Sequence, residues 1–464
     1  MWYDYSMFFK GDKNMLEKIF HLSEKNTNVK TEMIAGITTF LAMAYILGVN
    51  PSILGAAGMD VHSVFMATAI SAAVASIIMG VLANYPVALA PGMGVNALFT
   101  YTVVLGFGYS WQAALASVFV SGLVFILISV TGVRKLIINA IPVQLKLAIG
   151  AGIGFFIAFV GLKNAGIVVA DASTFVALGD LRNPVVLLAI IGILVTIFMV
   201  IKNVPAAVFV GMLFTAALGL VMHEVFGFSV LDSYGGELFP SLPSTFVTTD
   251  FSIETLGAFM EGIGELFANP GVAFVIIFSF LFVDFFDTAG TLVAVGNKIG
   301  LVNEKGEMEG VEKALLADSV GTVIGAALGT STVTSFVESS SGVGVGGRTG
   351  LTAVVTGLCF LLSIFISPVV LSTAVNAVTA PALVVVGIMM AQQLGGINWD
   401  DMVYAASGFV TVVFMILSYS ISNGIALGFI TYAVSMVAAR RIKEVSSVVW
   451  ALVLIFIIYF GWLI

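Results

Sequence analysis

The chain is a succession of long apolar segments separated by short polar ones. A helix needs roughly 20 apolar residues to cross a bilayer, and many of these segments approach or reach that length. The pattern therefore predicts fourteen transmembrane spans, seven on each side of the polar stretch 225–270: 32–50, 64–83, 87–105, 112–131, 143–165, 184–201 and 205–224, then 272–296, 314–328, 331–347, 350–367, 369–393, 402–419 and 421–439. A further apolar stretch, Val448 to Ile464, either spans or lies in the interface, and the pattern leaves both open.

Composition agrees with a membrane protein. Of the 464 residues, 59% are hydrophobic and 9% are charged, whereas roughly a quarter are charged in an ordinary soluble domain. So few charges cannot cover a water-soluble protein of this size, and lipid is the expected surrounding. The net charge of -8 gives no reason to expect a nucleic-acid partner. The single cysteine, Cys359, excludes an intrachain disulfide and a multi-cysteine metal site.

Basic residues orient the spans, because cytoplasmic loops carry an excess of Lys and Arg. Five lysines precede the first span and three basic residues follow the fourth: Lys10, Lys13, Lys18, Lys25, Lys30, Arg134, Lys135 and Lys146. Both regions, and therefore the N-terminus, are predicted to be cytoplasmic, in a multi-pass protein of the cell membrane. The acidic stretch 225–270 then lies outside, together with Lys163 and Arg182.

The two sets of seven spans resemble each other. Ala116 to Leu127 aligns without gaps on Leu351 to Leu362. Because each set has an odd number of spans, the second must run through the membrane upside down, which is the inverted-repeat plan of secondary transporters. Apolar residues at helical spacing also predict an interfacial helix before span one and another before span eight: Leu16, Ile19 and Phe20, then Ile253, Leu256, Met260 and Ile263.

Spans three and ten are interrupted at corresponding places. In span three, Pro91-Gly92-Met93-Gly94 follows an apolar run and argues against a continuous helix. In span ten, the β-favouring run 331–337 leads into a helix start at Glu338. The predicted fold class is therefore an all-α polytopic membrane protein, a 7+7 inverted repeat in which spans three and ten each begin with a short strand and continue as a half-helix.

These interruptions predict a binding site. They leave backbone groups unpaired at membrane depth, which is tolerated only beside protein or a wet cavity. A site near the midplane, with half-helix N-termini facing a ligand, is therefore expected. The alternative is that glycines merely let helices pack closely, and that interpretation is preferred for Gly122 and Gly357.

Four carboxylates stand out within the spans: Asp284, Asp287, Asp318 and Glu338. Asp284 and Asp287 are three residues apart and so share one helical face, with Thr288 beside them. Without a basic partner in the spans they cannot all be ionised, so at least one is expected to take up a proton, as a proton-coupled carrier requires. For Asp287 and Asp318 the alternative is a structural role, in bonds to nearby hydroxyls or backbone.

The sequence offers no basis for a cofactor or for catalysis. None of His21, His62 and His223 falls inside a span, and no metal-ligand spacing exists. The phosphate-loop pattern GxxxxGK[ST] is absent, so ATP is not expected to drive this chain. No nucleophile and base cluster is apparent. We therefore expect no cofactor, no metal and no enzymatic activity.

Four stretches carry a family resemblance: Thr31 to Pro51 (TEMIAGITTFLAMAYILGVNP), Ala90 to Asn96 (APGMGVN), Phe282 to Leu292 (FVDFFDTAGTL) and Thr334 to Leu351 (TSFVESSSGVGVGGRTGL). The chain resembles, over nearly its whole length, the adenine, guanine and hypoxanthine permease branch of the xanthine/uracil permease superfamily. The resemblance implies proton symport of a purine base, by alternating access between a core domain and a gate domain.

The resemblance also implies a division of the chain. The core comprises 31–135 and 271–367, which carry spans one to four and eight to eleven, and the gate comprises 136–224 and 368–440. The remaining parts are a cytoplasmic segment 1–30, an outer segment 225–270 with its interfacial helix, and an apolar tail 441–464. The oligomeric state stays open, including a homodimer.

By the family's pattern Asp284 and Glu338 contact the base, with Asn96 and Asp287 supporting the site. The full set of expected base ligands is Asp284, Glu338, Asn96, Thr288, Phe336 and Ser339, and the candidate stacking residues are Phe282, Phe285, Phe286 and Phe336. The candidate proton carriers are Glu338, Asp284, Asp287 and Asp318.

One position departs from related permeases. Uracil- and xanthine-type relatives can carry His one turn after the carboxylate of span eight, where this chain has Thr288. Their substrate and proton path therefore cannot be carried over. Two alternatives remain at this stage: a uracil, xanthine or anion transporter on the same fold, and a channel.

Overall fold

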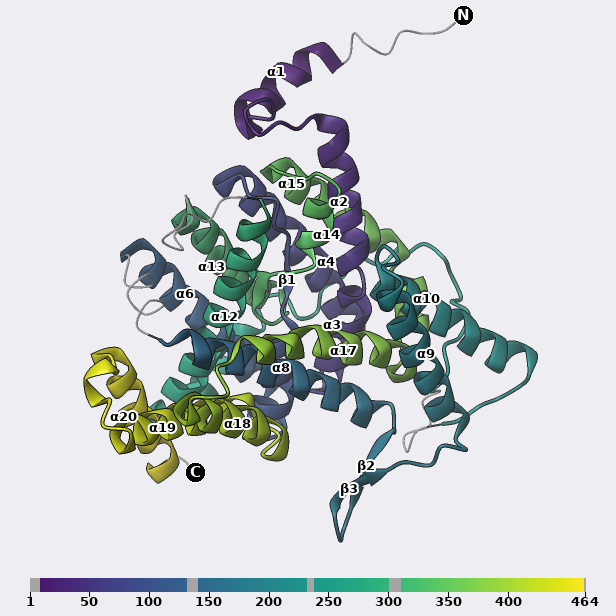
Figure 1. The fold of residues 1–464 in the computed structure, drawn as a ribbon. Coiled ribbons are helices and arrows are strands. Elements are labelled where there is room, and N and C mark those ends of the chain that lie inside the picture. The colour runs from purple at the N-terminus through teal and green to yellow at the C-terminus, as the bar shows by residue number, and fades with distance from the viewer. Residues whose placement is uncertain (1–8, 132–140, 232–237, 300–309, 463–464) are drawn as a thin grey trace, which may run out of the picture.

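The computed structural model describes residues 9–131, 141–231, 238–299 and 310–462 (Figure 1). The expected cytoplasmic residues Arg134 and Lys135 lie outside these ranges. The described part is a helical bundle from which the N-terminal helix α1 (Phe9–Phe20) projects.

Each expected span contains helix in the described residues. The first set comprises α2 (Val29–Met43) with α3 (Ile46–Gly55), α4 (Val61–Ile78) with η1 (Met79–Ala83), α5 (Met93–Ala97) with η2 (Leu98–Val104), α6 (Trp111–Thr131), α8 (Val143–Asn164), α9 (Pro184–Ile201), and α10 (Ala207–Leu220) with η3 (Val221–Val225). The second set comprises α12 (Pro270–Lys298), α13 (Val311–Leu328), α14 (Ser339–Gly344), α15 (Gly350–Ser363) with η4 (Ile364–Ile366) and α16 (Ser367–Thr373), α17 (Asn376–Ala391), α18 (Met402–Leu417) and α19 (Ile421–Ala438). The apolar tail forms α20 (Ser447–Trp462).

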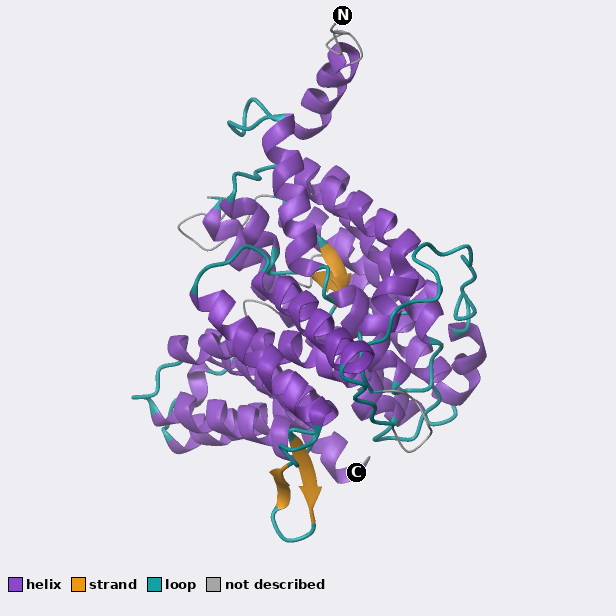
Figure 2. Cartoon of the chain, turned by 90° about the vertical axis from the view of Figure 1, so that its right-hand side faces the viewer, coloured by secondary structure: helices purple, strands orange, loops and turns teal. Residues whose placement is uncertain are grey.

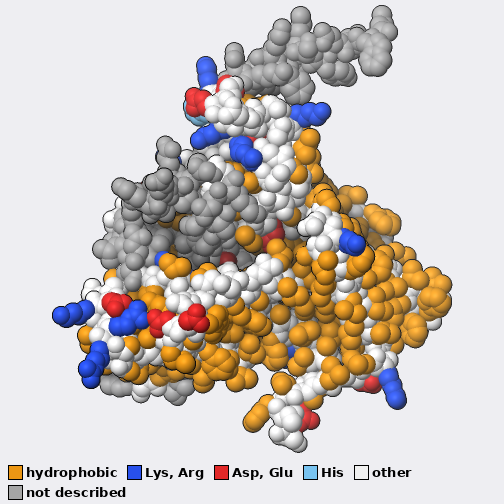
Figure 3. All heavy atoms as spheres, viewed as in Figure 1, with side chains coloured by type: hydrophobic (Ala, Val, Ile, Leu, Met, Phe, Trp, Pro, Cys, Tyr) orange, Lys and Arg blue, Asp and Glu red, His pale blue; other side chains and the backbone are white. Residues whose placement is uncertain are grey.

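The helices are suited to a lipid surrounding. Within the described ranges, nine helical stretches are long and apolar enough to cross a membrane. Hydrophobic side chains cover the face over α9 and α10, and charged side chains gather towards the margins of the molecule (Figure 3). The expected all-α membrane architecture is confirmed.

The interrupted spans three and ten meet at the centre of the bundle (Figure 2). Strand β1 (Leu89–Pro91) pairs antiparallel with β4 (Val333–Ser335), with Leu89 opposite Ser335 and Pro91 opposite Val333. This pairing satisfies backbone groups that a helix would otherwise satisfy, which a low-dielectric interior demands. The half-helix α5 follows β1 and the half-helix α14 follows β4, so the two short strands are confirmed.

The first span is interrupted as well, which the sequence analysis does not anticipate. Helix α2 ends at Met43 and α3 begins at Ile46, so Ala44 and Tyr45 form the junction. Pro51 lies inside α3, where it cannot donate a backbone hydrogen bond. Both junction residues keep right-handed helical backbone angles, and the Tyr45 side chain is buried.

The helices pack in two neighbourhoods. In one, α15 contacts α2 and α4, and α13 contacts α4 and α6. In the other, α8 contacts α17, α18 and α19, and α9 contacts α10 and α17; helices α8 and α17 cross the middle of the view together (Figure 1). Whether these neighbourhoods are the expected core and gate domains, moving separately, stays a prediction.

One contact in the first neighbourhood requires glycine on both sides. A Cβ atom on Gly350, at the start of α15, would collide with the carbonyl oxygen of Gly80 in η1. A Cβ on Gly80 would in turn collide with the carbonyl oxygen of Gly350. The two backbones therefore approach each other as closely as small residues allow.

Several boundaries differ from the sequence expectation. Span eleven does not end near 367 but continues through η4 and α16 to Thr373, because Pro368 lies in the first turn of α16, where its missing N–H costs little. The surface helix before span eight, α11 (Phe259–Leu266), covers only the second half of the predicted segment. A hairpin of β2 (Val168–Asp171) and β3 (Phe175–Leu178) follows α8 and projects from the bundle (Figure 2); it was not expected.

Candidate functional site

Two carboxylates, Asp287 and Asp318, contact the strand pair, one on each of its faces. The hydroxyl of Thr334 donates to Asp287 Oδ2 at 3.2 Å, and the hydroxyl of Ser335 donates to Asp318 Oδ1 at 3.3 Å. Successive strand residues point to opposite faces, so Asp287 and Asp318 approach β4 from different sides. The centre of the bundle is thus a small sheet with a carboxylate on each face.

Asp287 is the more open of these two carboxylates. Its side chain is half-buried, and a Cβ atom on Gly92 would lie 3.3 Å from its Oδ2. The absence of a side chain at Gly92 therefore lets the carboxylate approach the backbone where α5 begins. Gly92 is also the N-cap of α5 and provides no side-chain cap for its first amides.

Asp318 and Thr288 are bonded to each other. The hydroxyl of Thr288 donates to Asp318 Oδ1 at 2.7 Å, and both side chains are fully buried. Asp318 thus makes the bonds to nearby hydroxyls that the structural alternative requires. Thr288 uses its donor in this bond, so a ligand could reach only its lone pairs.

Asp284 is buried beside α13. Its side chain is 1% exposed, and Thr322 donates to its Oδ2 at 3.3 Å. The Thr322 hydroxyl lies 3.2 Å from the carbonyl oxygen of Val333 as well, so it lies between Asp284 and the start of β4. Of the two carboxylates on α12, Asp287 is the more exposed and Asp284 the more enclosed.

Glu338 lies at the N-terminus of α14 and bonds to Tyr45. The Tyr45 hydroxyl donates to Glu338 Oε1 at 2.5 Å. Glu338 is half-buried, whereas Tyr45 is 1% exposed. Tyr45 is not among the site residues expected from the sequence, although a tyrosine in the middle of an apolar span needs a partner for its hydroxyl.

Two further expected ligands, Ser339 and Phe336, connect the start of α14 to the residue before β1. The backbone amide of Ala88 donates to the Ser339 hydroxyl at 3.0 Å, and the amide of Phe336 donates to the carbonyl oxygen of Ala88 at 3.0 Å. The side chains of Ser339 and Phe336 are both buried. The amides of Ser339, Ser340 and Ser341 already donate to backbone carbonyls, so α14 offers fewer free donors than the sequence analysis assumed.

Asn96 lies at the other end of the strand pair. Its Oδ1 accepts a short hydrogen bond from the Ser331 hydroxyl, and its Nδ2 has no partner among the described residues. Because Pro91 is opposite Val333, Ser331 extends beyond one end of the pair and Glu338 beyond the other. Among the described residues no hydrogen bond joins Asn96 to Glu338.

The expected stacking residues are largely engaged with other rings. Phe282 contacts Phe429 and Phe456 at centroid distances of 5.6 and 6.3 Å. Phe285 lies 6.3 Å from Phe125. The side chain of Phe286 lies outside the described residues. Phe336, next to the start of α14, is the remaining candidate, and it is buried.

A fifth carboxylate, Glu32, was missed. It is fully buried in α2 and accepts from the amides of Arg348, Thr349 and Thr352 and from the Thr352 hydroxyl. These donors surround the start of α15, so Glu32 caps that helix from another span. The signal was an acidic residue at the edge of an apolar segment.

The basic residues near the spans also have defined partners. Arg348 donates from Nη1 to the carbonyl oxygens of Val343 and Gly347 at 2.8 and 2.7 Å, and so covers the end of α14. Lys163 is exposed, and its Nζ lies 4.5 Å from the ring centroid of Tyr419. Among the described residues, no cluster of three or more His, Cys, Asp and Glu side chains could hold a metal ion.

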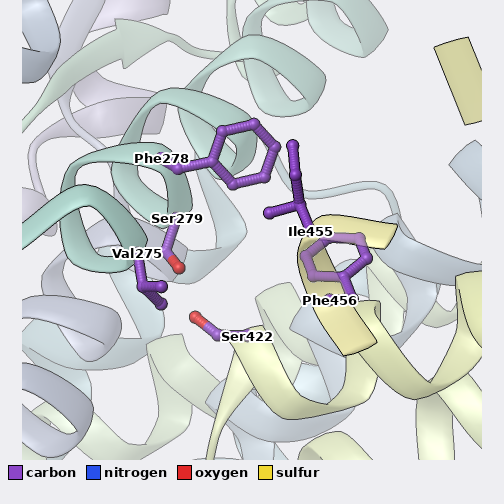
Figure 4. A pocket seen from close by; sticks show the side chains of 6 residues that line it. All are labelled: Val275, Phe278, Ser279, Ser422, Ile455 and Phe456. Atoms are coloured by element: carbon purple, nitrogen blue, oxygen red, sulfur yellow. The ribbon is translucent and has the colours of Figure 1, made fainter. Parts of the chain in front are cut away.

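A small cleft whose lining includes none of the four carboxylates lies between α12, α19 and α20 (Figure 4). It is lined by Val275, Phe278, Ser279, Ser422, Ile455 and Phe456. Phe278 lies 6.0 Å from Phe456 across it, which packs α20 against α12. The lining carries two hydroxyls and no charge, so it lacks the groups that would recognise a polar ligand.

The interrupted spans, the central strand pair and the carboxylates held within an apolar bundle define the chain as a multi-pass membrane transport protein. Residues 30–427 match the model of a family described as the permease family. The chain belongs to this permease family.

Two relatives illustrate the match. The chain is 47% identical over 454 residues to the guanine/hypoxanthine permease PbuG of Bacillus subtilis (strain 168), covering 96% of this chain and 99% of that one. It is 44% identical over 446 residues to the adenine permease AdeP of Escherichia coli (strain K12), covering 96% of each. The resemblance to the purine branch of the superfamily is confirmed.

Solved structures share the fold at low identity. The transmembrane domain of the cyanobacterial bicarbonate transporter BicA has a TM-score of 0.59 and 16% identity, covering 86% of this chain and 97% of that chain. The murine anion transporter Slc26a9 in its inward-facing state also has a TM-score of 0.59, with 9% identity, covering 95% of this chain and 73% of that chain. At these identities the likeness concerns the fold alone.

Proposed function

We propose that this permease imports purine nucleobases by proton symport. The observation that carries the proposal is the 47% identity, over nearly the full length of both chains, to a relative named as a guanine/hypoxanthine permease. The site supports it, because carboxylates accept hydrogen bonds from the ring N–H and amino groups of a purine. The same carboxylates would repel an anion, which disfavours an anion substrate.

The proposed site lies along the strand pair. Glu338 and Asp284 accept from the base, and Asn96, Thr288, Phe336 and Ser339 complete its surroundings. Glu338 is half-buried and can meet a base directly, whereas Asp284 is buried against Thr322 and must exchange that bond. Asp287, half-buried on the same helix, is the alternative carboxylate ligand.

The same carboxylates would also couple transport of the base to transport of a proton. A carboxylate that binds a base while charged and releases it while neutral links substrate to proton. The candidates are Glu338, Asp284, Asp287 and Asp318. In the proposed mechanism the core moves against the gate around the site, in a cell membrane with the N-terminus cytoplasmic. A homodimer is compatible with this scheme.

The substrate is tested by competition uptake in cells that lack their own purine carriers. Labelled hypoxanthine should accumulate and be competed by unlabelled hypoxanthine, guanine or adenine. Uptake should rise at acidic external pH and collapse with a protonophore. Equal competition by uracil, equilibration without accumulation, or dependence on sodium in place of protons would each contradict the proposal.

The carboxylates are tested by Asp284→Asn and Glu338→Gln. These changes keep size and hydrogen-bonding atoms but remove the ability to titrate. Loss of a charged partner should weaken base binding by about 1.5 to 3 kcal/mol, or about one to two decades. Glu312→Gln, at an exposed position in the first turn of α13, is the matched control. Parental accumulation by both site variants, at normal abundance, would remove these two residues from the site.

A further inference from the structure

Tyr45 is the one described residue that donates a side-chain hydrogen bond to Glu338. The hydroxyl oxygen lies 2.5 Å from Glu338 Oε1, and the two residues are 293 positions apart in the chain. Tyr45 belongs to the junction between α2 and α3, where neither helix extends over it. From this junction the hydroxyl reaches the start of α14.

The approach of α2 to α14 fixes this distance. Gly342 of α14 faces α2, and a Cβ atom there would lie 2.6 Å from the carbonyl oxygen of Ala35 and collide with the Thr39 hydroxyl. Only glycine allows the two backbones to come so close. The close contact one turn into α14 brings Glu338, at its N-terminus, within reach of the tyrosine ring that follows α2.

Glu338 does not cap its own helix with its side chain. It occupies the N-cap position of α14, where an acidic side chain usually folds back to accept from the first amides. No such capping bond exists here. The carboxylate is instead held by the Tyr45 hydroxyl through one oxygen and by the backbone amide of Glu338 itself, while the group remains half-buried. A carboxylate can accept about four hydrogen bonds, so Tyr45 leaves capacity for a ligand.

We propose that Tyr45 is a positioning residue for the purine site: it holds one carboxylate oxygen of Glu338 so that the other faces the base. This inference rests on the proposed function of Glu338 as a base ligand. The neighbouring charged group is Asp287 of α12, which lies within electrostatic range of both Glu338 and Tyr45. The Tyr45 bond limits the rotamers of Glu338, so the position of its carboxylate beside Asp287 is set before a base binds.

The test is Tyr45→Phe, which removes one hydroxyl and keeps the buried ring. Binding of labelled hypoxanthine to the purified full-length protein should weaken about tenfold, as expected when a bond to a charged group is lost. The maximal uptake rate at saturating base should change much less than the affinity. Tyr432→Phe, a change of the same kind at another buried tyrosine, is the control and should bind like the parent.

A double-mutant cycle shows whether Tyr45 acts through Glu338. In a Glu338→Gln background the hydroxyl faces a neutral acceptor, and bonds to charged groups are roughly twice as strong as neutral ones. The effect of Tyr45→Phe should therefore shrink from about tenfold to about threefold. Replacement of Tyr45 by 4-aminophenylalanine, which keeps a weaker donor at the same place, should restore most of the affinity.

The outcomes separate this inference from the proposed function. If the parent binds purines but Tyr45→Phe binds as tightly, the positioning role is wrong and the function stands. An equal loss in both backgrounds, or no recovery with 4-aminophenylalanine, would assign Tyr45 to the fold alone and also overturns the role. If the parent binds no purine in the same assay, the function and the inference fail together.

Discussion

The side-chain amide of Asn164 donates a hydrogen bond of 2.9 Å to the hydroxyl oxygen of Tyr101, joining the end of α8 to η2. Beside it, Lys163 donates to the Tyr419 hydroxyl at 3.3 Å. The Tyr101 and Tyr419 rings lie 5.4 Å apart in an edge-to-face arrangement. The cluster therefore connects span three to span five and to the end of span thirteen, at the end of the molecule next to the β2–β3 hairpin.

Removing the Tyr101 hydroxyl, which accepts the hydrogen bond from Asn164, should lower the stability of the folded protein. Tyr101→Phe leaves the Asn164 amide without its partner in a half-buried place, at a cost of about 1 kcal/mol. The apparent unfolding temperature of the purified protein in detergent should fall. Tyr109→Phe, in the loop that follows η2, serves as the control, and an equal shift in both variants would show that the bond contributes nothing specific.

The contact between Gly80 and Gly350 predicts a strong steric effect. Gly350→Ala places a methyl group against the Gly80 carbonyl, and neither partner is a flexible side chain that could move aside. We expect destabilisation of about 1 to 3 kcal/mol or more, with less folded protein in the membrane. At Gly264 of α11 the same change meets open space and should stabilise by about 0.5 to 1 kcal/mol. Normal abundance and thermal stability of Gly350→Ala would contradict the close packing.

The hydrogen bonds that Glu32 accepts at the start of α15 should stabilise the folded protein. Glu32→Gln replaces one acceptor oxygen by an amide that cannot accept, so at least one buried donor at the start of α15 loses its partner. The expected cost is about 1 to 3 kcal/mol, measured as a lower unfolding temperature. Glu24→Gln is the control, because that side chain is 73% exposed. A Glu32→Gln protein as stable as the parent would mean that the cap is unimportant.

The pH dependence of stability should include a contribution from Asp401. Its Oδ2 accepts from Arg441 Nη1 at 2.5 Å, and this bond holds the pKa of the Asp401 carboxyl below its ordinary value. A carboxyl with a lowered pKa in the folded state adds stability above the unfolded value of about 4, and loses it as pH falls through the folded value. Asp401→Asn should therefore be less stable than the parent at neutral pH, with the difference vanishing in acid.

The substitution isolates the ion pair, because Asn caps a helix about as well as Asp and Asp401 also caps α18. Asp400→Asn, one residue earlier and exposed, is the matched control. The measurement is thermal unfolding in detergent from neutral to acidic pH. A difference between Asp401→Asn and the parent that stays constant across this range would contradict the assignment.

The sequence was sufficient for the architecture because lipid imposes a strong rule. Long apolar segments must be helices, and interruptions at Pro91 and before Glu338 must be paired inside the bundle. Both interruptions are followed by short helices, and the expected strands pair with each other. The β2–β3 hairpin was missed because its strands are mostly apolar runs of only four residues, largely exposed, and neither burial nor a polar–apolar alternation marks them.

The partners of the site residues could not be predicted from one sequence. The Tyr45–Glu338 bond spans 293 positions and the bonds between Glu32 and Thr352 span 320. Composition and spacing identify a carboxylate inside a span but not which hydroxyl reaches it. The difference in exposure between Asp284 and Asp287 is equally a tertiary effect, because both lie on one helix three residues apart.

The register of β1 and β4 limits how the centre of the molecule can move. Thr334 and Ser335 present their hydroxyls to different carboxylates on opposite faces. A slip of one strand by a single residue would turn every side chain to the other face, and Thr334 would then point away from Asp287. Only a slide of two residues, about 7 Å, restores the faces. The strand pair therefore fixes the position of one inverted half relative to the other. Any displacement of one interrupted span must move the other with it.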